Sequence, residues 1–334
     1  MRSKPSVAGF FITTSSRLTI FSAVSLVLAI SPCLAEFPLF SEGKPTFEVV
    51  IGGNPPSTEE FAAEEIAFFA QRMCGVRPEI VPEGSAPPSK AIIIGTPESS
   101  LLIRGVSGFL HLDRLKKDEG YVVRISPERI YIGSKSARGV LYGAYELIER
   151  MISKATGMKV VSLDFRIPRV GFLSLNDRTI SSEPYFPIRA TLDPEDADWL
   201  ARHRVNFSLA EGVWSGTGVD DGIASAFKYV LAPRFDEYQD EPWLARWERV
   251  NRLTERFRQL KRRGIEPYLF MYLMGEPTKA LIRNHPELLG QSLPGDSFDR
   301  TMPYHPLCWS NPKLRKLLRD LIKEIVRTYP DLAG

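Results

Sequence analysis

Residues 119–151 read EGYVVRISPERIYIGSKSARGVLYGAYELIERM, and this stretch decides the fold because it predicts a β-hairpin followed by a helix. The segments 121–125 and 130–132 are rich in β-branched and aromatic residues, as strands are, and Pro127 between them fits a type I turn. After the hairpin, Ser136 can cap a helix. Apolar side chains then recur at three- and four-residue spacing, which predicts a helix with one face on a sheet. These apolar positions are Val140, Ala144, Leu147, Ile148 and Met151.

Two glycines, Gly139 and Gly143, lie inside this predicted helix, where each costs about 1 kcal/mol relative to alanine. Their spacing predicts a face on which the helix and sheet backbones approach too closely for a Cβ. A phosphate-binding loop is the alternative interpretation. Its glycines would stand before the first helical turn and follow G-x-G-x-x-G, and the segment 138–143, RGVLYG, meets neither condition.

The chain upstream of this stretch alternates short strands with helices. A helix is expected to begin at 57–60, where STEE has the pattern of a capping box, and a weaker helix is expected within 98–112. Strands are expected at 46–51, 79–81 and 91–95. Together with the hairpin and its helix, this alternation predicts a small α/β sandwich domain over residues 36–158.

The hairpin end I-G-S followed by ARGVLYGAYELIE also carries a family resemblance. It resembles the last hairpin and helix of the small α/β domain that precedes the catalytic barrel in family 20 β-N-acetylhexosaminidases and family 67 α-glucuronidases. The resemblance implies an accessory domain of the hexosaminidase/α-glucuronidase N-terminal type, followed by a TIM barrel. It also implies hydrolysis of a terminal sugar.

The N-terminus has the pattern of a secretory signal peptide. Residues 1–17 carry three cations and no acid, and the apolar run at 18–30 is too short to span a bilayer comfortably. Ala35, with the small Cys33 two positions earlier, fits signal-peptidase cleavage before Glu36. We therefore expect residues 1–35 to be removed and the protein to be secreted or periplasmic, without a membrane attachment. An uncleaved anchor is the alternative.

Removal of this leader would leave 40 basic and 40 acidic residues, because the 43 basic residues of the sequence include the three leader cations. No net charge then favours nucleic acid as a partner. The arginines of 246–263 are interleaved with acids, so we expect solvated surface there rather than a site for an anionic polysaccharide. Cys74 and Cys308 indicate no disulfide framework, and the four histidines show no metal-ligand spacing. We expect no cofactor and no metal.

The second half of the chain has a different pattern of predicted strands and helices. Residues 159–185 are expected to form a connector, and 186–334 then alternates three strands with helices. The strands are expected at 186–192, 205–209 and 267–274, and the helices after Asp193, at 241–263 and from Asn311. This pattern predicts the opening of a parallel (β/α)8 TIM barrel, although a doubly wound sheet would give the same pattern. A barrel takes roughly 250 residues, so we expect an incomplete barrel of three β/α units and interpret the sequence as a fragment.

Arg189 is the first candidate for contact with a sugar. Residues 186–189, FPIR, resemble the first barrel strand of the family 20 enzymes, whose arginine at this place holds hydroxyls of the terminal sugar. Ala190 follows, where those enzymes usually have glycine. The resemblance implies that Arg189 lies near the carboxyl end of its strand and donates two hydrogen bonds to adjacent hydroxyls. An ion pair at the barrel rim is the alternative.

Other candidates follow the second and third predicted strands. Glu211 and Trp214 come after the second strand, where barrel loops gather at the active face, and an indole can stack on the apolar face of a sugar. His305 and Trp309, with Cys308 beside them, lie in the long loop after the third strand, and the same argument applies to them.

Glycosidase chemistry needs two carboxyl groups flanking the scissile bond, or one acid plus a substrate acetamido group oriented by a second carboxylate. In the resembling families these acids come at or after the fourth barrel strand, so no catalytic residue is assigned, and the acids are expected beyond Gly334. We interpret the chain as part of a secreted glycoside hydrolase acting on terminal sugars of a glycan, β-N-acetylhexosaminidase-like or α-glucuronidase-like, and expect this chain alone to be inactive. A noncatalytic secreted carbohydrate-binding protein is the alternative.

Overall fold

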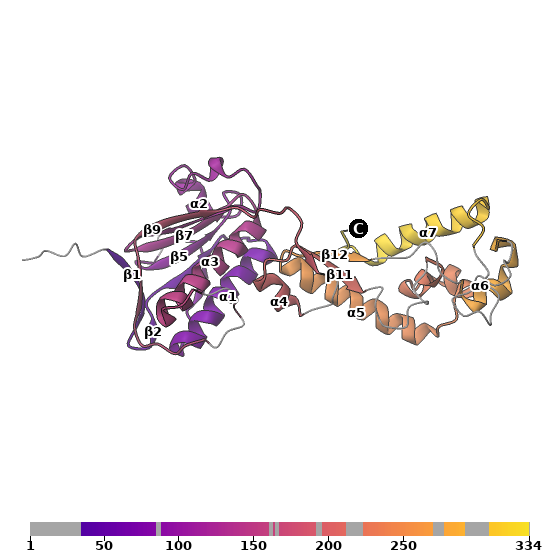
Figure 1. The fold of residues 1–334 in the computed structure, drawn as a ribbon, viewed down its shortest axis with the longest axis horizontal. Helices are drawn as coiled ribbons and strands as arrows, with labels where there is room; N and C mark the ends of the chain where they lie inside the picture. The colour runs from indigo at the N-terminus through magenta and orange to yellow at the C-terminus, as the bar shows by residue number, and fades with distance from the viewer. Residues whose placement is uncertain are drawn as a thin grey trace, which may run out of the picture. The chain divides into compact units, whose positions relative to one another are not determined.

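The computed structural model describes residues 35–84, 88–159, 163, 167–191, 196–211, 223–269, 277–290 and 307–333 (Figure 1). These residues form a mixed α/β fold with a six-stranded sheet, a small antiparallel sheet and a parallel sheet. The expected fold class, an α/β domain followed by parallel β/α units, is confirmed. Within the described ranges, no helix is both long enough and apolar enough to cross a membrane.

The six-stranded sheet is the centre of the α/β domain and has the strand order β4-β3-β5-β7-β6-β9. Its strands are β3 (Glu48–Ile51), β4 (Ile80–Pro82), β5 (Ala91–Gly95), β6 (Tyr121–Ile125), β7 (Arg129–Ser134) and β9 (Arg178–Ser182). Strands β4, β3, β5 and β7 run parallel, while β6 runs antiparallel to both β7 and β9. Tyr121 pairs with Ser134 and Ile125 with Ile130, so the predicted hairpin is confirmed.

Two strands lie in the segment 159–185, which was expected to be a connector. Strand β8 (Leu173–Asn176) pairs antiparallel with β1 (Glu36–Ser41), and β1 also pairs with β2 (Lys44–Pro45). Strand β9 extends the six-stranded sheet along β6. The expectation is wrong for these residues because β9 is an edge strand, largely exposed, and its sequence RTISS lacks the apolar alternation that marks a half-buried strand.

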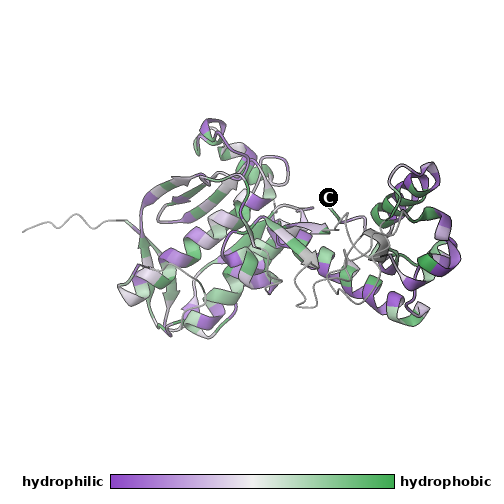
Figure 2. Cartoon of the chain, turned by 45° about the vertical axis from the view of Figure 1, so that its right-hand side comes forward, coloured by the Kyte–Doolittle hydropathy of each residue, from purple (hydrophilic) through white to green (hydrophobic). Residues whose placement is uncertain are grey.

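Helices cover both faces of the six-stranded sheet. On one face α1 (Ser57–Cys74) and α3 (Ala137–Thr156) pack on each other and on the strands, where they share a buried apolar cluster with Val49 and Ile92. On the other face α2 (Leu101–Val106) and the short 3₁₀ helix η1 (Leu112–Arg114) cover Val50 and Ile93. Neighbouring strand residues therefore face opposite helical layers, as the period of a strand requires. Figure 2 shows that the helices carry both hydrophobic and hydrophilic residues along their lengths.

The two glycines of α3 lie where the sequence predicted a close approach. A Cβ on Gly139 would stand 2.0 Å from Ser134 Oγ and 2.8 Å from the carbonyl oxygen of Gly120, and a Cβ on Gly143 would stand 2.5 Å from Ile132 Cγ2. The helix also begins as predicted, because Ser136 Oγ accepts a hydrogen bond from the amide of Gly139 at 3.1 Å. The glycines thus allow α3 to lie directly on β7.

The start of α1 differs from the expected capping box at 57–60. Pro56 is the residue that caps this helix, and no side chain hydrogen-bonds to the free amides of the first turn. The Glu59 side chain points inward instead, where it accepts hydrogen bonds from Ser99 Oγ at 2.9 and 2.7 Å. Burial raises the pKa of Glu59 above its usual value, against the lowering effect of Ser99.

The parallel sheet consists of β10 (Ala190–Thr191), β11 (Phe207–Glu211) and β12 (Glu266–Leu269). Ala190 pairs with Phe207, and Phe207 with Glu266. The helices of this half are α4 (Ala197–Arg202), α5 (Trp243–Arg262), α6 (Lys279–Asn284) and α7 (Pro312–Thr328), with 3₁₀ helices η2 (Ile223–Tyr229), η3 (Pro233–Tyr238) and η4 (Pro286–Leu288). Parallel strands joined by helices are the arrangement with which a β/α barrel opens, and the incomplete barrel of three β/α units stays a prediction.

The helix starts of this half agree partly with the sequence. Asn311 Oδ1 accepts a hydrogen bond from the amide of Lys313 at 2.9 Å, so the predicted start of α7 is confirmed. In α4 the cap is Asp196, which accepts from the amides of Asp198 and Trp199, whereas the expected Asp193 falls on 192–195, outside the described residues.

The first turns of helix α5 bury a charged residue and expose two apolar ones. Arg246 is 2% exposed, and its guanidinium donates a hydrogen bond to Asp236 Oδ1 at 2.6 Å, while Leu244 and Trp247 are exposed. The expectation that the arginines of this helix are all solvated is therefore wrong for Arg246, because an acid from η3 pairs its charge. The buried apolar positions of α5 are Val250, Leu253, Phe257 and Leu260.

Candidate functional site

The carboxyl ends of β10, β11 and β12 form the edge at which a parallel β/α sheet usually binds its ligand. Glu211 is the last residue of β11, so its backbone lies at this edge. Trp214 and His305 fall on 212–222 and 291–306, outside the described residues. Trp309 lies in the turn before α7 and is 42% exposed. Contact of these residues with a glycan stays a prediction.

Arg189 lies at the other end of the sheet. The strand β10 begins at Ala190, so Arg189 precedes it, and the expected place near the carboxyl end of the strand is wrong. The reason is the register: the amides of Asn206 and Phe207 donate hydrogen bonds to the carbonyl oxygen of Arg189 at 3.0 and 3.3 Å, which pairs it with the start of β11. Arg189 and Glu211 are therefore separated by the length of the parallel sheet.

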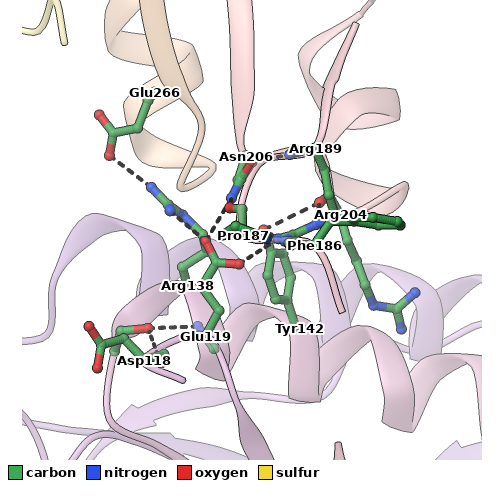
Figure 3. A network of polar contacts seen from close by, with 12 residues as sticks. Asp118, Glu119, Arg138, Tyr142, Phe186, Pro187, Arg189, Arg204, Asn206 and Glu266 are labelled. Carbon is green, nitrogen blue, oxygen red and sulfur yellow. Dashed lines mark hydrogen bonds and ion pairs between the residues drawn. The ribbon is translucent and has the colours of Figure 1, made fainter. Parts of the chain in front are cut away.

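Arg189 belongs to a cluster of charged and polar side chains that we call the polar joint. The polar joint consists of Glu119, Arg138, Tyr142, Arg189, Asn206 and Glu266 (Figure 3). Glu119 is central: its Oε1 accepts hydrogen bonds from Arg138 Nη1 at 2.7 Å and from Asn206 Nδ2 at 2.9 Å. Its Oε2 accepts from Arg189 Nη2 at 2.6 Å. Arg138 also donates to Glu266 Oε1 at 2.8 Å, so two carboxylates and two guanidiniums link the α/β domain to the parallel sheet.

Most members of the polar joint lie at or near the start of a helix or strand. Arg138 and Tyr142 are four residues apart on α3, so they project from the same face of the helix. Asn206 directly precedes β11, and Glu266 is the first residue of β12. The polar joint thus connects α3 of the α/β domain to the amino ends of the parallel strands.

The guanidinium of Arg189 is engaged on every nitrogen. Nε donates to the carbonyl oxygen of Arg204 at 2.7 Å and Nη1 to that of Phe186 at 2.6 Å. Nη2 donates to Glu119 and, at 2.8 Å, to the hydroxyl of Tyr142, whose ring also lies 5.3 Å below the guanidinium carbon. These contacts agree with the ion-pair alternative for Arg189, and its contact with a sugar stays a prediction.

The electrostatics of the polar joint favour one protonation state of Glu119 and of Tyr142. Burial opposes ionisation of Glu119, but hydrogen bonds from Asn206, Arg138 and Arg189 outweigh it and lower the pKa of this carboxyl below its usual value. Burial, together with the charge of Glu119, raises the pKa of Tyr142 to about 12. At neutral pH, Glu119 is therefore ionised and Tyr142 is a neutral phenol, so the polar joint is suited to holding structure rather than to moving protons.

Substituting Arg189 with lysine tests this structural role. We expect Arg189→Lys to lower the free energy of unfolding by about 1.5–3 kcal/mol, because a single ammonium cannot reach the acceptors that the guanidinium fork spans. Chemical denaturation measures the change. Arg258→Lys is the matched control, since Arg258 is exposed and pairs with Glu255 on the helix surface, and it should change stability by about 0.5 kcal/mol or less. Unchanged stability of Arg189→Lys with weaker glycan binding would support sugar contact instead.

In the part of the chain that the structure describes, no group of three or more His, Cys, Asp or Glu side chains is placed to hold a metal ion. The sequence pointed to Arg189 but not to its partners Glu119, Arg138 and Asn206. A charged residue two positions before a strand and an arginine in the first turn of a helix were the available signals, and both are also common on surfaces.

Comparison with known proteins adds a family match for part of the α/β domain. Residues 43–147 match the family model for the N-terminus of glycosyl hydrolase family 67. No curated protein sequence matches the chain.

Three solved structures illustrate the likeness in fold. A GH138 enzyme targeting pectin rhamnogalacturonan II superposes with a TM-score of 0.55 at 13% identity, over 86% of this chain and 30% of that enzyme. A mutant Streptomyces plicatus β-hexosaminidase in complex with the product GlcNAc has a TM-score of 0.49 at 16% identity, over 89% of this chain and 55% of the enzyme. Flavobacterium johnsoniae chitobiase has a TM-score of 0.47 at 18% identity, over 88% of this chain and 41% of that enzyme.

The chain thus spans about a third of the length of the GH138 enzyme, and at 13% identity that likeness shows the fold alone. The matched residues include strands β3 to β7 of the six-stranded sheet, helices α1 and α2 and the first half of α3, but not β9. Residues 43–147 are therefore similar to the N-terminal domain of glycosyl hydrolase family 67.

Proposed function

We propose that this protein is a glycoside hydrolase that removes terminal sugars from a glycan, with the α/β domain as an accessory domain beside the catalytic β/α units. The observation that carries the proposal is the match of residues 43–147 to the family 67 N-terminus, followed in the chain by a parallel sheet with intervening helices. The polar joint supports it further, because it fixes the accessory domain to the amino ends of β10, β11 and β12 and leaves their carboxyl ends for substrate.

The reaction would be of one of two types. The family match makes α-glucuronidase-like activity the first to test, and β-N-acetylhexosaminidase-like activity the second. Either requires a pair of carboxyl groups around the scissile bond, or one acid with the acetamido group of the substrate. Glu211, at the carboxyl edge of the parallel sheet, would then lie on the face where the sugar binds.

The assay uses the full-length protein from its intact reading frame. Xylo-oligosaccharides that carry glucuronic acid and 4-nitrophenyl N-acetyl-β-glucosaminide are the two substrates. We expect release of glucuronic acid from the first or of nitrophenolate from the second. Glycan binding with no hydrolysis of either substrate would favour the noncatalytic carbohydrate-binding alternative, and neither binding nor hydrolysis would refute both.

Export belongs to the same proposal. The three cations and the apolar run before Ala35 support a cleaved leader and a secreted or periplasmic location. Mass spectrometry of the exported protein should give Glu36 as its first residue, and a mature protein that begins at Met1 would contradict the proposal.

A further inference from the structure

A pocket of about 390 Å³ lies beside the polar joint and is not explained by it. One wall comes from β6 and α3, and the other from the segment that runs from β9 to β10 and from the residues before β11. We call it the joint pocket and define it by Tyr121, Glu146, Glu149, Tyr185, Phe186 and Arg204. Its volume falls in the range of small-ligand sites, roughly 300–1,000 Å³.

The rim of the joint pocket carries two exposed aromatic rings. Tyr185 is 84% exposed and Phe186 is 62% exposed, and their rings meet edge to face with centroids 4.9 Å apart. Lys117 holds this segment in place, since its ammonium donates a hydrogen bond to the carbonyl oxygen of Tyr185 at 2.8 Å and lies 5.9 Å from the ring centroid. Adjacent aromatic rings that are exposed yet anchored offer flat apolar surface for a ligand to stack on.

The inner wall of the joint pocket is polar, and its charges are paired. Glu146 accepts hydrogen bonds from the Tyr121 hydroxyl at 3.0 Å and from Arg150 Nε at 2.7 Å. Glu149 accepts from Arg204 Nη1 at 2.7 Å. The wall therefore presents carboxylate oxygens held by partners on the protein, which can accept further hydrogen bonds from hydroxyl groups.

This combination of a stacking surface with fixed acceptors fits a sugar ring, which has an apolar face and hydroxyls around its edge. An anionic sugar fits less well. The guanidinium of Arg204 is paired with Glu149, and that of Arg189, which also lines the pocket, is engaged on each nitrogen. A ligand carboxylate would find no cation without a partner on this wall, and it would face Glu146 as well as Glu149.

We propose that the joint pocket binds a neutral sugar unit of a glycan chain at a place separate from the site of hydrolysis. The separation follows from position: Arg189 and Arg204 lie at the amino ends of the parallel strands, opposite the edge expected to carry the chemistry. The idea rests on the proposed function for its choice of ligand class. It adds a second subsite, through which the accessory domain would hold a polymer while its end is cleaved.

Calorimetry with three probes tests the proposal on the full-length protein: xylohexaose, N-acetylchitohexaose and hexagalacturonate. We expect saturable binding of at least one neutral hexasaccharide, and an affinity at least 10-fold lower in the double variant Tyr185→Ala/Phe186→Ala. Phe109→Ala is the matched control, because Phe109 is 63% exposed and lies outside the pocket lining, and it should bind as the wild type does. Both variants change exposed side chains, so their melting temperatures should stay within about 2 °C of the wild type.

A hydrogen-exchange measurement locates the site independently. Adding the bound neutral hexasaccharide should slow amide exchange in 182–186 and in the part of α3 that carries Glu146 and Glu149. Three results would overturn the proposal: no binding of either neutral hexasaccharide, wild-type affinity in the double variant, or tighter binding of hexagalacturonate than of both neutral probes.

These outcomes are separable from those of the hydrolysis assay. Hydrolysis together with wild-type binding by the double variant would refute sugar binding in the joint pocket and leave the proposed function intact. Suppose instead that the protein hydrolyses neither assay substrate but binds a hexasaccharide in a way that depends on Tyr185 and Phe186. This result would support sugar binding in the joint pocket and count against the proposed hydrolysis.

Discussion

Glu119→Ala is expected to lower the free energy of unfolding by about 3–4 kcal/mol, the largest stability loss that we predict. The side chain is only 14% exposed, and its removal leaves Arg138 and Arg189 as largely buried cations without their shared carboxylate. Breaking a buried charge pair by deleting one partner typically costs about 3–5 kcal/mol, and the residual exposure places this site at the lower end. Denaturant unfolding measures the loss.

The control for this prediction is an acid of the same type on the surface. Glu255 is 52% exposed and pairs with Arg258 three residues later on α5, so Glu255→Ala should change stability by about 0.5 kcal/mol or less. Equal effects of the two substitutions would show that the polar joint does not stabilise the fold.

The same carboxyl gives stability a defined pH dependence. Because the pKa of Glu119 is lower in the folded protein than its usual 4.5, its ionised form stabilises the fold above that pH. This contribution is lost as the pH falls through the folded-state pKa. The difference in stability between the wild type and Glu119→Gln should therefore be largest above about pH 4.5 and shrink in more acidic buffer. A difference that grows on acidification would contradict the assignment.

Gly139→Ala is expected to cost about 3 kcal/mol of unfolding free energy. The new Cβ would collide with Ser134 Oγ and with the backbone carbonyl of Gly120, so α3 would have to move away from β7. Overpacking of this kind costs about 1–3 kcal/mol, and backbone atoms cannot rotate out of the way as a flexible side chain can. Thermal unfolding should show the loss as a lower melting temperature.

Gly105 provides the matched substitution. It also lies inside a helix, α2, but a Cβ there would meet no atom within 4 Å. Gly105→Ala should therefore be neutral or raise stability by about 0.4–1 kcal/mol, through the lower entropy of the unfolded chain. If the two substitutions had similar effects, the close approach of α3 and β7 would not explain the glycine at 139.

Local signals explain how much of the fold could be predicted. The hairpin, the start of α3 and the two glycines rest on residues within a few positions of each other, where turn chemistry and helix capping act directly. The same holds for Asn311 at the start of α7. These features depend little on the rest of the chain.

The features that the sequence did not predict depend on partners that are distant along the chain. The Glu59 side chain points away from the start of its helix because Ser99, 40 residues later, donates a hydrogen bond to it. Arg189 meets Glu119 across 70 residues, and no local pattern links the two. The candidate site was therefore predictable as a list of residue types at strand ends, but not as a set of contacts.

The pairing of β1 with β8 has a consequence for the order in which the domain can assemble. Glu36 accepts a hydrogen bond from Ser174, 138 residues later, and β9, which pairs with β6, comes still later in the chain. During synthesis, the first strand must wait for most of the domain to emerge, and contacts of such separation are slow to form. A chain stopped at 158 would keep both helices of the main face yet leave the outer edge of β6 open to strands of other molecules. We expect β9, an edge strand with polar and charged side chains, to cover this edge of β6 and to lower the tendency of the sheet to aggregate.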